Sequence, residues 1–239
     1  MRLNRYVAMS GAASRRKAEQ IIRAGRVAIN GVPATDPARS VSPATDRITL
    51  DGTPLVVKPQ KRVILLNKPT GVIVSVGDTH GRTTVMDLLG DDAAGLFPVG
   101  RLDRDTSGVL LLTNDGDLAH RLMHPSYGVE KVYRAEVAGS IGENIIARFR
   151  AGIDLADGPT APAGLVVVKQ SGESSLAEVT LHQGRKRQVR RMLEAVGHPV
   201  RSLERISFGG ITAKDLKRGK YRQLTPREVA SLKAQVGLE

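Results

Sequence analysis

The 239-residue sequence contains no cysteine and no tryptophan, and aromatic residues make up only 3% of it. The missing cysteine excludes disulfides, a thiol nucleophile and cysteine-ligated zinc, and it is consistent with a reducing cytoplasm. No apolar run approaches the roughly 18–20 residues that cross a bilayer, so we expect no membrane partner. The first residues lack the leucine-rich centre of a signal peptide, which favours a folded segment over a targeting signal.

Acidic residues are also scarce, since 24 Asp and Glu stand against 36 Lys and Arg, and the formal net charge is +12. Residues 1–26 hold seven basic residues against one acid, and residues 185–222 hold twelve against three. A basic balance of this size predicts an anionic partner. Two separated basic blocks favour two contact surfaces on one polyanion over charge that serves solubility alone.

The first block has a recognisable local pattern. Ser14 is a suitable N-cap for a helix over residues 15–24, in which apolar side chains recur at helical spacing. The period then changes to two, and Asn30-Gly31 is a strong hairpin signal. Basic residues 15–17 occupy the first helical turn, where the helix dipole disfavours cations by about a few tenths of a kcal/mol each. A docked phosphate explains this placement; the alternative is that so small a cost is simply tolerated.

This order of helix, basic helix and hairpin resembles the small RNA-binding domain first known from ribosomal protein S4, over roughly residues 1–58. The resemblance implies a module that binds structured RNA through its backbone. Such modules also occur in proteins without activity, so they do not establish catalysis. A short polar linker is expected over residues 58–61. The implied RNA contacts of the module are Arg5, Arg15, Arg16, Lys17 and Arg26.

The segment over residues 100–108, Gly-Arg-Leu-Asp-Arg-Asp-Thr-Ser-Gly, is a charged loop that leads directly into the apolar strand expected at residues 109–112. Asp103 therefore lies at the mouth of a core, and the charges of Arg101 and Arg104 favour its ionised form. Loop aspartates usually serve turns and caps. Residue chemistry alone leaves both roles open for Asp103.

The same segment resembles the signature of the bacterial ribosomal pseudouridine synthases, G-R-L-D-x-x-T-S-G. Three further segments are similar to motifs of that family and occur in the same order, so the resemblance spans nearly the whole chain. They are Asn67-Lys68-Pro69 with Gly71, Lys131-Val132-Tyr133, and residues 184–192 (GRKRQVRRM).

The resemblance and the strand pattern together imply an α+β protein. A small N-terminal α/β RNA-binding domain, residues 1–58, precedes a larger catalytic domain, residues 59–239. The larger domain is expected to be built on a mixed, mainly antiparallel sheet with flanking helices. One helix is expected to begin at Asp117, and another carries an apolar stripe from Val189 to Val196.

The activity that the resemblance implies is isomerisation of a uridine, in which the bond from base to ribose breaks and the base rejoins through carbon 5. This reaction needs no cofactor and no metal. Asp103 is implied as the essential carboxylate, and Tyr133 as the residue that stacks on the uracil, although a packed structural tyrosine is the alternative. Arg190 is implied to pair with Asp103; the alternative is a surface pair with Glu194, four residues further on the helix.

The family resemblance also implies contacts to the RNA around the target. The base must be swung out of a folded RNA, at a cost of about a few kcal/mol, and in related enzymes an arginine at the position of Arg101 fills the gap. The implied RNA contacts of the catalytic domain are Lys68, Arg101, Arg104, Lys131, Arg187 and Arg191.

We expect the substrate to be ribosomal RNA, free or in pre-ribosomal particles, with no obligatory protein partner and a monomer in the cytoplasm. Residues 184–192 are closer to the large-subunit (23S) branch, whereas the GGIT and GKYRQLT segments resemble the small-subunit (16S) enzyme. A non-catalytic RNA-binding protein is an alternative, and so is a hydrolase that uses Asp103 and Asp105. His120 and His124 have a spacing that zinc can use, but no third ligand is near in sequence, so no metal is expected.

Overall fold

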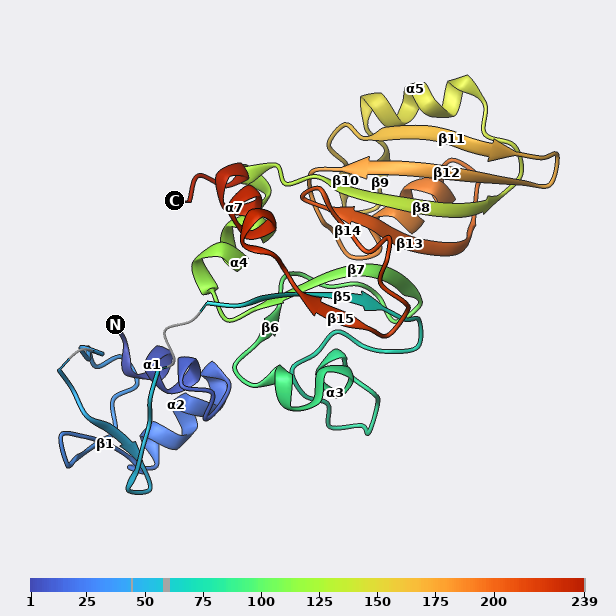
Figure 1. Ribbon diagram of the computed structural model, residues 1–239. Helices are drawn as coiled ribbons and strands as arrows, with labels where there is room; N and C mark the ends of the chain where they lie inside the picture. Colours follow the sequence, from blue (N-terminus) through green and yellow to red (C-terminus); the bar gives the residue numbers. More distant parts are fainter. Residues whose placement is uncertain (44, 58–60, 239) are drawn as a thin grey trace. The chain divides into compact units, whose positions relative to one another are not determined.

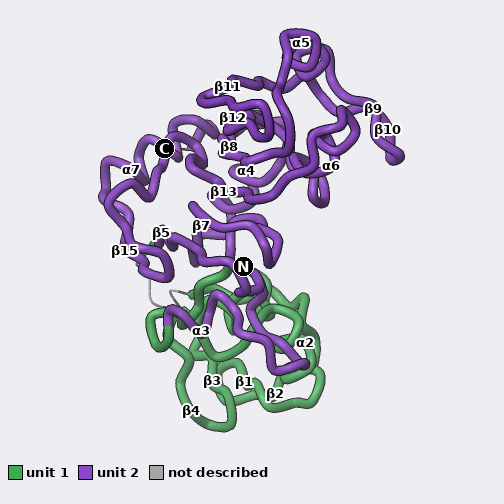
Figure 2. The backbone as a smooth tube through the Cα atoms, turned by 90° about the vertical axis from the view of Figure 1, so that its right-hand side faces the viewer, with its two compact units in different colours: residues 1–62, 90–97 green, residues 63–89, 98–239 purple. Residues whose placement is uncertain are grey.

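The computed structural model describes residues 1–43, 45–57 and 61–238, and the chain divides into two compact units (Figures 1 and 2). Unit 1 comprises Met1–Arg62 and Gly90–Phe97, and unit 2 comprises Val63–Leu89 and Pro98–Glu239. The boundary expected between residues 58 and 59 lies outside the described residues, as does most of the expected linker. Within the described part of the chain, no helix has the length and apolar character needed to span a membrane.

Unit 1 pairs two helices with a small antiparallel sheet of strand order β2-β1-β3-β4. Ser14 caps the second helix by accepting a hydrogen bond from the Lys17 backbone, and three apolar side chains of this helix are buried as expected. Asn30 and Gly31 both have positive φ, at 53° and 85°, which is the geometry of the predicted two-residue hairpin. The elements are α1 (Leu3–Met9), α2 (Arg15–Arg23), β1 (Val27–Ile29), β2 (Val32–Ala34), β3 (Ile48–Leu50), β4 (Thr53–Pro54) and a 3-10 turn (Gly90–Ala93).

Unit 2 contains a large sheet with the strand order β11-β12-β8-β13-β7-β5-β15, to which β14 and β6 add short pairings. Among the described pairings of this sheet, β13 and β7 run parallel and the others are antiparallel, so the predicted mixed, mainly antiparallel sheet is confirmed. Its strands are β5 (Val63–Lys68), β6 (Phe97–Pro98), β7 (Thr106–Thr113), β8 (Lys131–Ala138), β11 (Gly164–Gln170), β12 (Ser174–Leu181), β13 (Val200–Phe208), β14 (Ile211–Thr212) and β15 (Tyr221–Gln223).

Helices flank this sheet, as Figure 1 shows for α5 beside β11 and for α7 at the C-terminal end. The helix expected from Asp117 begins one residue earlier, because the Asp115 side chain caps it by accepting a hydrogen bond from the Leu118 backbone. The remaining elements of unit 2 are α3 (Val85–Leu89), α4 (Gly116–Met123), a 3-10 turn (Pro125–Tyr127), α5 (Glu143–Ala151), β9 (Asp154–Leu155), β10 (Gly158–Pro159), α6 (Gln188–Ala195) and α7 (Pro226–Gln235).

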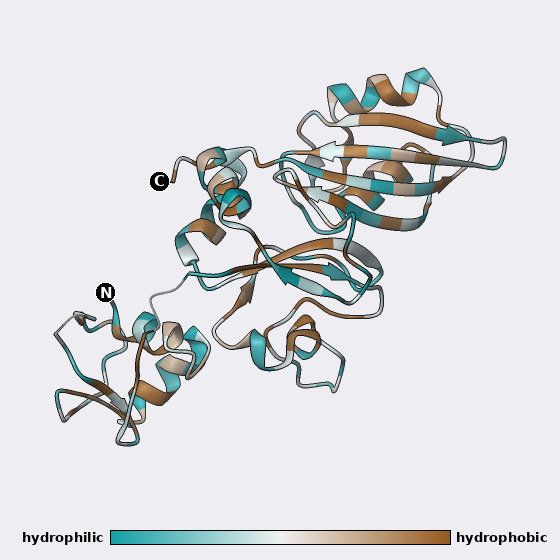
Figure 3. Ribbon diagram, viewed as in Figure 1, coloured by the Kyte–Doolittle hydropathy of each residue, from teal (hydrophilic) through white to brown (hydrophobic). Residues whose placement is uncertain are grey.

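Burial along the strands follows their place in the sheet. All residues of β5 and β7 are buried, and each strand contains an apolar run, residues 63–66 in β5 and 109–112 in β7. By contrast, β8 and β12 alternate between buried and more exposed positions, and hydrophobic and polar colours alternate along them in Figure 3. The apolar stripe predicted on α6 is confirmed, since Val189, Met192, Leu193 and Val196 all join the core beside these strands.

The parallel pairing of β7 with β13 depends on a glycine. Gly108 lies opposite Arg205 in the register of the two strands, and its φ of +105° is in the region that favours glycine. A Cβ at this position would lie 2.2 Å from the Arg205 carbonyl oxygen. The glycine that ends the loop motif therefore has a steric reason: at Gly108 the backbones of β7 and β13 approach each other too closely for any side chain.

Replacing Gly108 by alanine is expected to lower the free energy of unfolding by at least about 2 kcal/mol, because the backbone has to move and adopt a strained φ. Urea unfolding followed by circular dichroism measures the change. Gly116→Ala is the matched control, since a Cβ there meets nothing within 4 Å and alanine favours the helix. Equal stabilities for the Gly108 variant and the wild type would contradict the steric argument.

Candidate active site

Asp103 lies in the loop that immediately precedes β7, where its side chain is partly buried. Its backbone carbonyl oxygen accepts hydrogen bonds from the Thr106 N–H, at 3.1 Å, and from the Lys68 ammonium, also at 3.1 Å. Within the part of the chain that the structure describes, its carboxylate forms no hydrogen bond or ion pair. The backbone of Asp103 is thus fixed, while the carboxylate is available to a ligand.

Lys68, the last residue of β5, fixes this loop by hydrogen bonds from its side chain. Its side chain is fully buried, and its Nζ donates to the carbonyl oxygens of Pro69, Asp103 and Thr106 at 3.0, 3.1 and 2.8 Å. Burial lowers the pKa of Lys68 to about 8, although the negative charges of Asp105 and Asp103 oppose this shift. Lys68, which is expected as an RNA contact, is thus buried in the structure, and its ammonium group binds the loop backbone.

Arg190 is directed into the same loop, but towards a different carboxylate from the one expected. Its Nη2 lies 3.1 Å from Asp105 Oδ2 and 3.0 Å from the Asp105 carbonyl oxygen, and the Nη1 of Arg187 lies 3.6 Å from Asp105 Oδ1. The expected pairing with Asp103 and the alternative pairing with Glu194 are both absent from the described ion pairs. The reason is that Arg190 is buried at the edge of the apolar face of α6, where its long side chain reaches the end of the loop.

Tyr133 is half-buried on β8 and packs against the same core as Ala135 and Val137, as its alternation predicts. Its neighbour across the sheet is Arg205 of β13, whose guanidinium carbon lies 6.0 Å from the centre of the Tyr133 ring. Arg205 is 2% exposed, and its Nε donates to the Val109 carbonyl oxygen at 2.7 Å. Sequence reasoning missed Arg205; the available signal was a charged residue two positions after Leu203, on the inward side of a strand.

Lys131 begins β8 and is only 8% exposed. Its Nζ donates to the Val129 carbonyl oxygen at 2.7 Å and lies 5.4 Å from the centre of the Phe208 ring. Burial lowers the pKa of Lys131 to about 8, and the positive charge of Arg205 lowers it further in the same direction. Lys131, which is expected as a phosphate contact, thus lies on the inward face of β8, where its ammonium group is removed from the surface.

The other basic residues expected to bind RNA have accessible side chains. Arg101, Arg104 and Arg187 are exposed, while Arg191 is partly buried and pairs with Asp157 at 2.7 Å. In unit 1 the expected contacts are exposed as well, and Arg26 forms an ion pair with Asp51. These side chains remain predicted RNA contacts, and those of unit 1 are Arg5, Arg15, Arg16, Lys17 and Arg26.

His120 of α4 and His124, which follows the last residue of that helix, have ring centres 5.5 Å apart and ring planes tilted by 31°. His124 turns towards the short helical turn that follows α4, where its ring accepts a hydrogen bond from the Ser126 backbone. Among the described residues, no group of three or more His, Asp and Glu side chains is placed to hold a metal ion.

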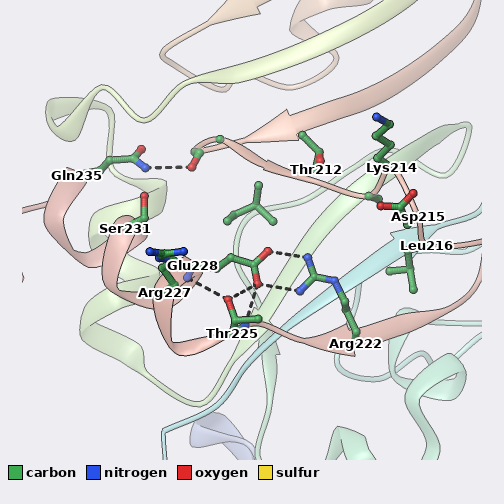
Figure 4. A pocket seen from close by; sticks show the side chains of 14 residues that line it. Thr212, Lys214, Asp215, Leu216, Arg222, Thr225, Arg227, Glu228, Ser231 and Gln235 are labelled. Carbon is green, nitrogen blue, oxygen red and sulfur yellow. Dashed lines mark hydrogen bonds and ion pairs between the residues drawn. The ribbon is translucent and has the colours of Figure 1, made fainter.

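A cavity of about 550 Å³ opens elsewhere in unit 2, between the turn from β13 to β14, the segment after β14 and helix α7. Figure 4 shows its wall, where Glu228 forms an ion pair with Arg222 and a capping box with Thr225. The Arg222 hydrogen bond is the main cause that lowers the pKa of Glu228 to about 2. None of the residues expected to form the active site lines this cavity.

The chain is similar to known proteins over both of its units. A family model described as RNA pseudouridylate synthase matches residues 62–195, a range that contains Asp103, Tyr133 and Arg190, and an S4 domain model matches residues 1–48. An RNA pseudouridine synthase of Aquifex aeolicus is 44% identical, covering 100% of this chain and 96% of its own length.

Two further relatives cover nearly the whole chain. Ribosomal large subunit pseudouridine synthase B of Bacillus subtilis is 42% identical, over 98% of this chain and 96% of its own length. A crystal structure described as a pseudouridylate synthase is 32% identical and matches with a TM-score of 0.70, over 97% of this chain and 99% of that chain. Both units of the chain therefore have counterparts in single proteins.

The partner of Arg190 is open to a double-mutant cycle in the absence of RNA. We expect Arg190→Ala and Asp105→Ala to be coupled by about 0.5–1 kcal/mol, near the low end for contacting residues because Asp105 is half exposed to solvent. Arg190→Ala and Asp103→Ala should show a smaller coupling. Urea unfolding of the four proteins in each cycle gives both values, and the reverse order would favour the pairing that the sequence alone predicts.

Burial of Lys131 predicts a pH dependence of stability. Since the pKa of Lys131 is about 8 in the folded chain and ordinarily 10.5, the unfolded chain binds more protons between these pH values, and the free energy of unfolding rises with pH. Relative to Lys131→Met, the wild type should gain roughly 1–3 kcal/mol from pH 8 to 10.5. Denaturant unfolding at several pH values measures this gain.

Lys169→Met is the matched control, because Lys169 is exposed on β11 and its removal should leave the pH profile parallel to that of the wild type. A parallel profile for Lys131→Met as well would show that Lys131 is solvated.

Proposed function

The chain belongs to the RNA pseudouridylate synthase family, and from this premise we propose that it isomerises a specific uridine of ribosomal RNA, with Asp103 as the essential carboxylate. The observation that carries the assignment of Asp103 is the contrast between its backbone and its side chain. Lys68 and Thr106 fix the backbone by hydrogen bonds, whereas the carboxylate meets no partner among the described residues. A side chain that reacts with a substrate must be held in a fixed position, and its reactive group must be free of other partners.

Asp103 and Asp105 have different surroundings, which separates their roles. Asp105 is bound by Arg190 and faces Arg187, so its carboxylate stabilises the loop and is not available to react. This arrangement also speaks against a hydrolase with two cooperating acids, because such an enzyme needs two carboxyl groups that converge on one bond. Arg190 acts on the reaction as a positioning residue, through the loop that carries Asp103.

Tyr133 is proposed to contact the uracil of the target. It is half-buried, so its ring is fixed on one side by the core and by the Arg205 guanidinium. A ring fixed in this way can stack on a base that has been swung out of the RNA, which is a common way to hold such a base. Arg101 is exposed in the same loop as Asp103, and it is proposed to fill the gap that the base leaves.

Ribosomal RNA is proposed as the substrate because of the relative from Bacillus subtilis, whose name assigns it to the large ribosomal subunit. The proposal thus favours 23S ribosomal RNA, free or in pre-ribosomal particles, over 16S ribosomal RNA. The N-terminal S4 domain binds RNA in this proposal through its five exposed basic residues, and the cytoplasm is the proposed location. The formal net charge of +12 supports a nucleic acid as the partner.

Tritium release from ribosomal RNA labelled at carbon 5 of uracil tests the proposal. The wild type should release tritium to water and leave no free base, since isomerisation replaces the hydrogen at carbon 5. Asp103→Asn should reduce the rate to below about one-hundredth of the wild-type value, while it still binds the RNA in a filter-binding assay.

Asp105→Asn is the matched control, because it removes the same charge two residues away. It should lower the rate less than Asp103→Asn does, since Arg190 then loses only part of its contact with the loop. Normal release by the Asp103 variant would overturn the assignment of the carboxylate, and release of free uracil by the wild type would indicate a hydrolase.

A further inference from the structure

The segment between β14 and β15 carries a cluster of cations that the active site does not use. Lys214, Lys217 and Lys220 are all exposed, and the sole acid among residues 213–220 is Asp215. Within the described part of the chain, the three ammonium groups form no hydrogen bond or ion pair. We call residues 214–220 the lysine loop. Three unneutralised cations on so short a segment repel one another, which is a cost unless an anion binds there.

The lysine loop is held in one conformation by a single buried residue, Asn67. The Asn67 side chain donates to the Leu216 carbonyl oxygen at 2.5 Å and accepts from Arg218 Nη1 at 2.8 Å. Its backbone N–H donates to the Lys220 carbonyl oxygen at 3.0 Å, and its own carbonyl oxygen accepts from the Gly219 N–H at 2.8 Å. Four hydrogen bonds to one residue restrict the loop far more than solvated surface charge requires.

A second anchor acts through the same cation that binds Asn67. Arg218 Nη2 lies 2.7 Å from Glu204 Oε2 of β13. The arginine of the lysine loop thus serves to attach the loop to Asn67 and to β13. The three lysines remain exposed and take no part in this attachment. Lysine suits the remaining task, because its compact charge binds a phosphate without the fixed fork geometry of arginine.

Asn67 is directly followed by Lys68, the residue that holds the loop of Asp103. Consecutive residues of this strand therefore bind the two loops: Asn67 binds the lysine loop, and Lys68 binds the carbonyl oxygens of Asp103 and Thr106. β15 and β7 both begin at the end of β5 where these two residues lie, as Figure 1 shows. The lysine loop and Asp103 are consequently fixed at the same end of the sheet, on either side of β5.

We propose that the lysine loop binds backbone phosphates of the substrate RNA close to the target uridine, and that Asn67 keeps this contact in register with Asp103. The inference rests on the proposed function, because it takes RNA as the ligand. RNA fits the cluster because its phosphates are regularly spaced single charges, and such contacts position a nucleic acid without reading its sequence. A loop that is already ordered loses little further conformational entropy when it binds.

The test replaces all three lysines by glutamine and measures binding to unlabelled ribosomal RNA together with tritium release. Three lost phosphate contacts should make the slope of log affinity against log salt less steep by about 2–3 units. At moderate salt the KM for RNA should rise by at least about tenfold, while kcat stays within about twofold, because phosphate contacts position the RNA and take no part in the chemistry.

The matched control removes the same charge from a different surface, with Arg148→Gln, Arg150→Gln and Lys169→Gln combined. These residues are exposed on α5 and β11, at the other edge of the sheet from β15. The control should change the salt slope by less than half as much. If both triple variants behave alike, the lysine loop contributes only to net charge and the inference is wrong.

The two proposals fail in distinguishable ways. If the wild type releases no tritium, the proposed reaction is wrong, but the salt slopes still show whether the lysine loop binds RNA. If the wild type is active and the lysine-loop variant keeps the wild-type salt slope and KM, the reaction stands and the loop has no role in binding. Asn67→Ala tests separately whether Asn67 keeps the lysine loop in register with Asp103. This variant should raise the KM for RNA although all three lysines are still present.

Discussion

The ammonium group of Lys68 is the contact on which the candidate active site depends. It is buried at the end of β5 and binds the carbonyl oxygens of Asp103 and Thr106 as well as that of Pro69, so a chain segment with little regular structure acquires a fixed path. Carbonyl oxygens inside a protein need donors, and a single cation here supplies three of them. Burial weakens the hold of Lys68 on its proton, but the two nearby aspartates oppose that effect.

Once the loop is fixed, its two acidic residues no longer compete for the same partner. Arg190 reaches the loop from α6 and takes Asp105, which leaves the carboxylate of Asp103 open to a substrate. A charged residue on the buried face of a helix would be costly without this pairing. The two acids thus differ because α6 brings Arg190 to Asp105. This helix begins at Gln188, directly after Arg187, whose φ is positive at 51°.

Much of the fold could be predicted from local patterns. The capped basic helix after Ser14, the Asn30-Gly31 hairpin and the stripe on α6 all rest on neighbours within a few residues, where periodicity and turn chemistry apply. Asp103 was predicted through its motif, since its chemistry alone is that of any loop aspartate. The family motif also predicted that Arg190 pairs with Asp103, whereas the ion pair in the structure joins Arg190 to Asp105, two residues further on.

What the sequence could not show depends on partners distant along the chain. Lys68 and Lys131 were expected to contact RNA, and only the assembled sheet reveals the carbonyl oxygens and the aromatic ring that surround their buried ammonium groups. Arg205 was missed for the same reason, because its contacts come from β7 and β8. The hydrogen bonds of Asn67 to residues about 150 positions later likewise cannot be predicted from any local pattern.

The parallel pairing of β7 with β13 also determines when the site can form. β7 ends at Thr113 and β13 begins at Val200, so the five strands from β8 to β12 and the helices between them are synthesised before the partner of β7. Contacts between segments so far apart in sequence form slowly, because a long stretch of chain loses its freedom when they close. Asp103 lies in the loop that leads into β7, so the proposed site is complete only after segments about 100 residues apart in sequence have paired.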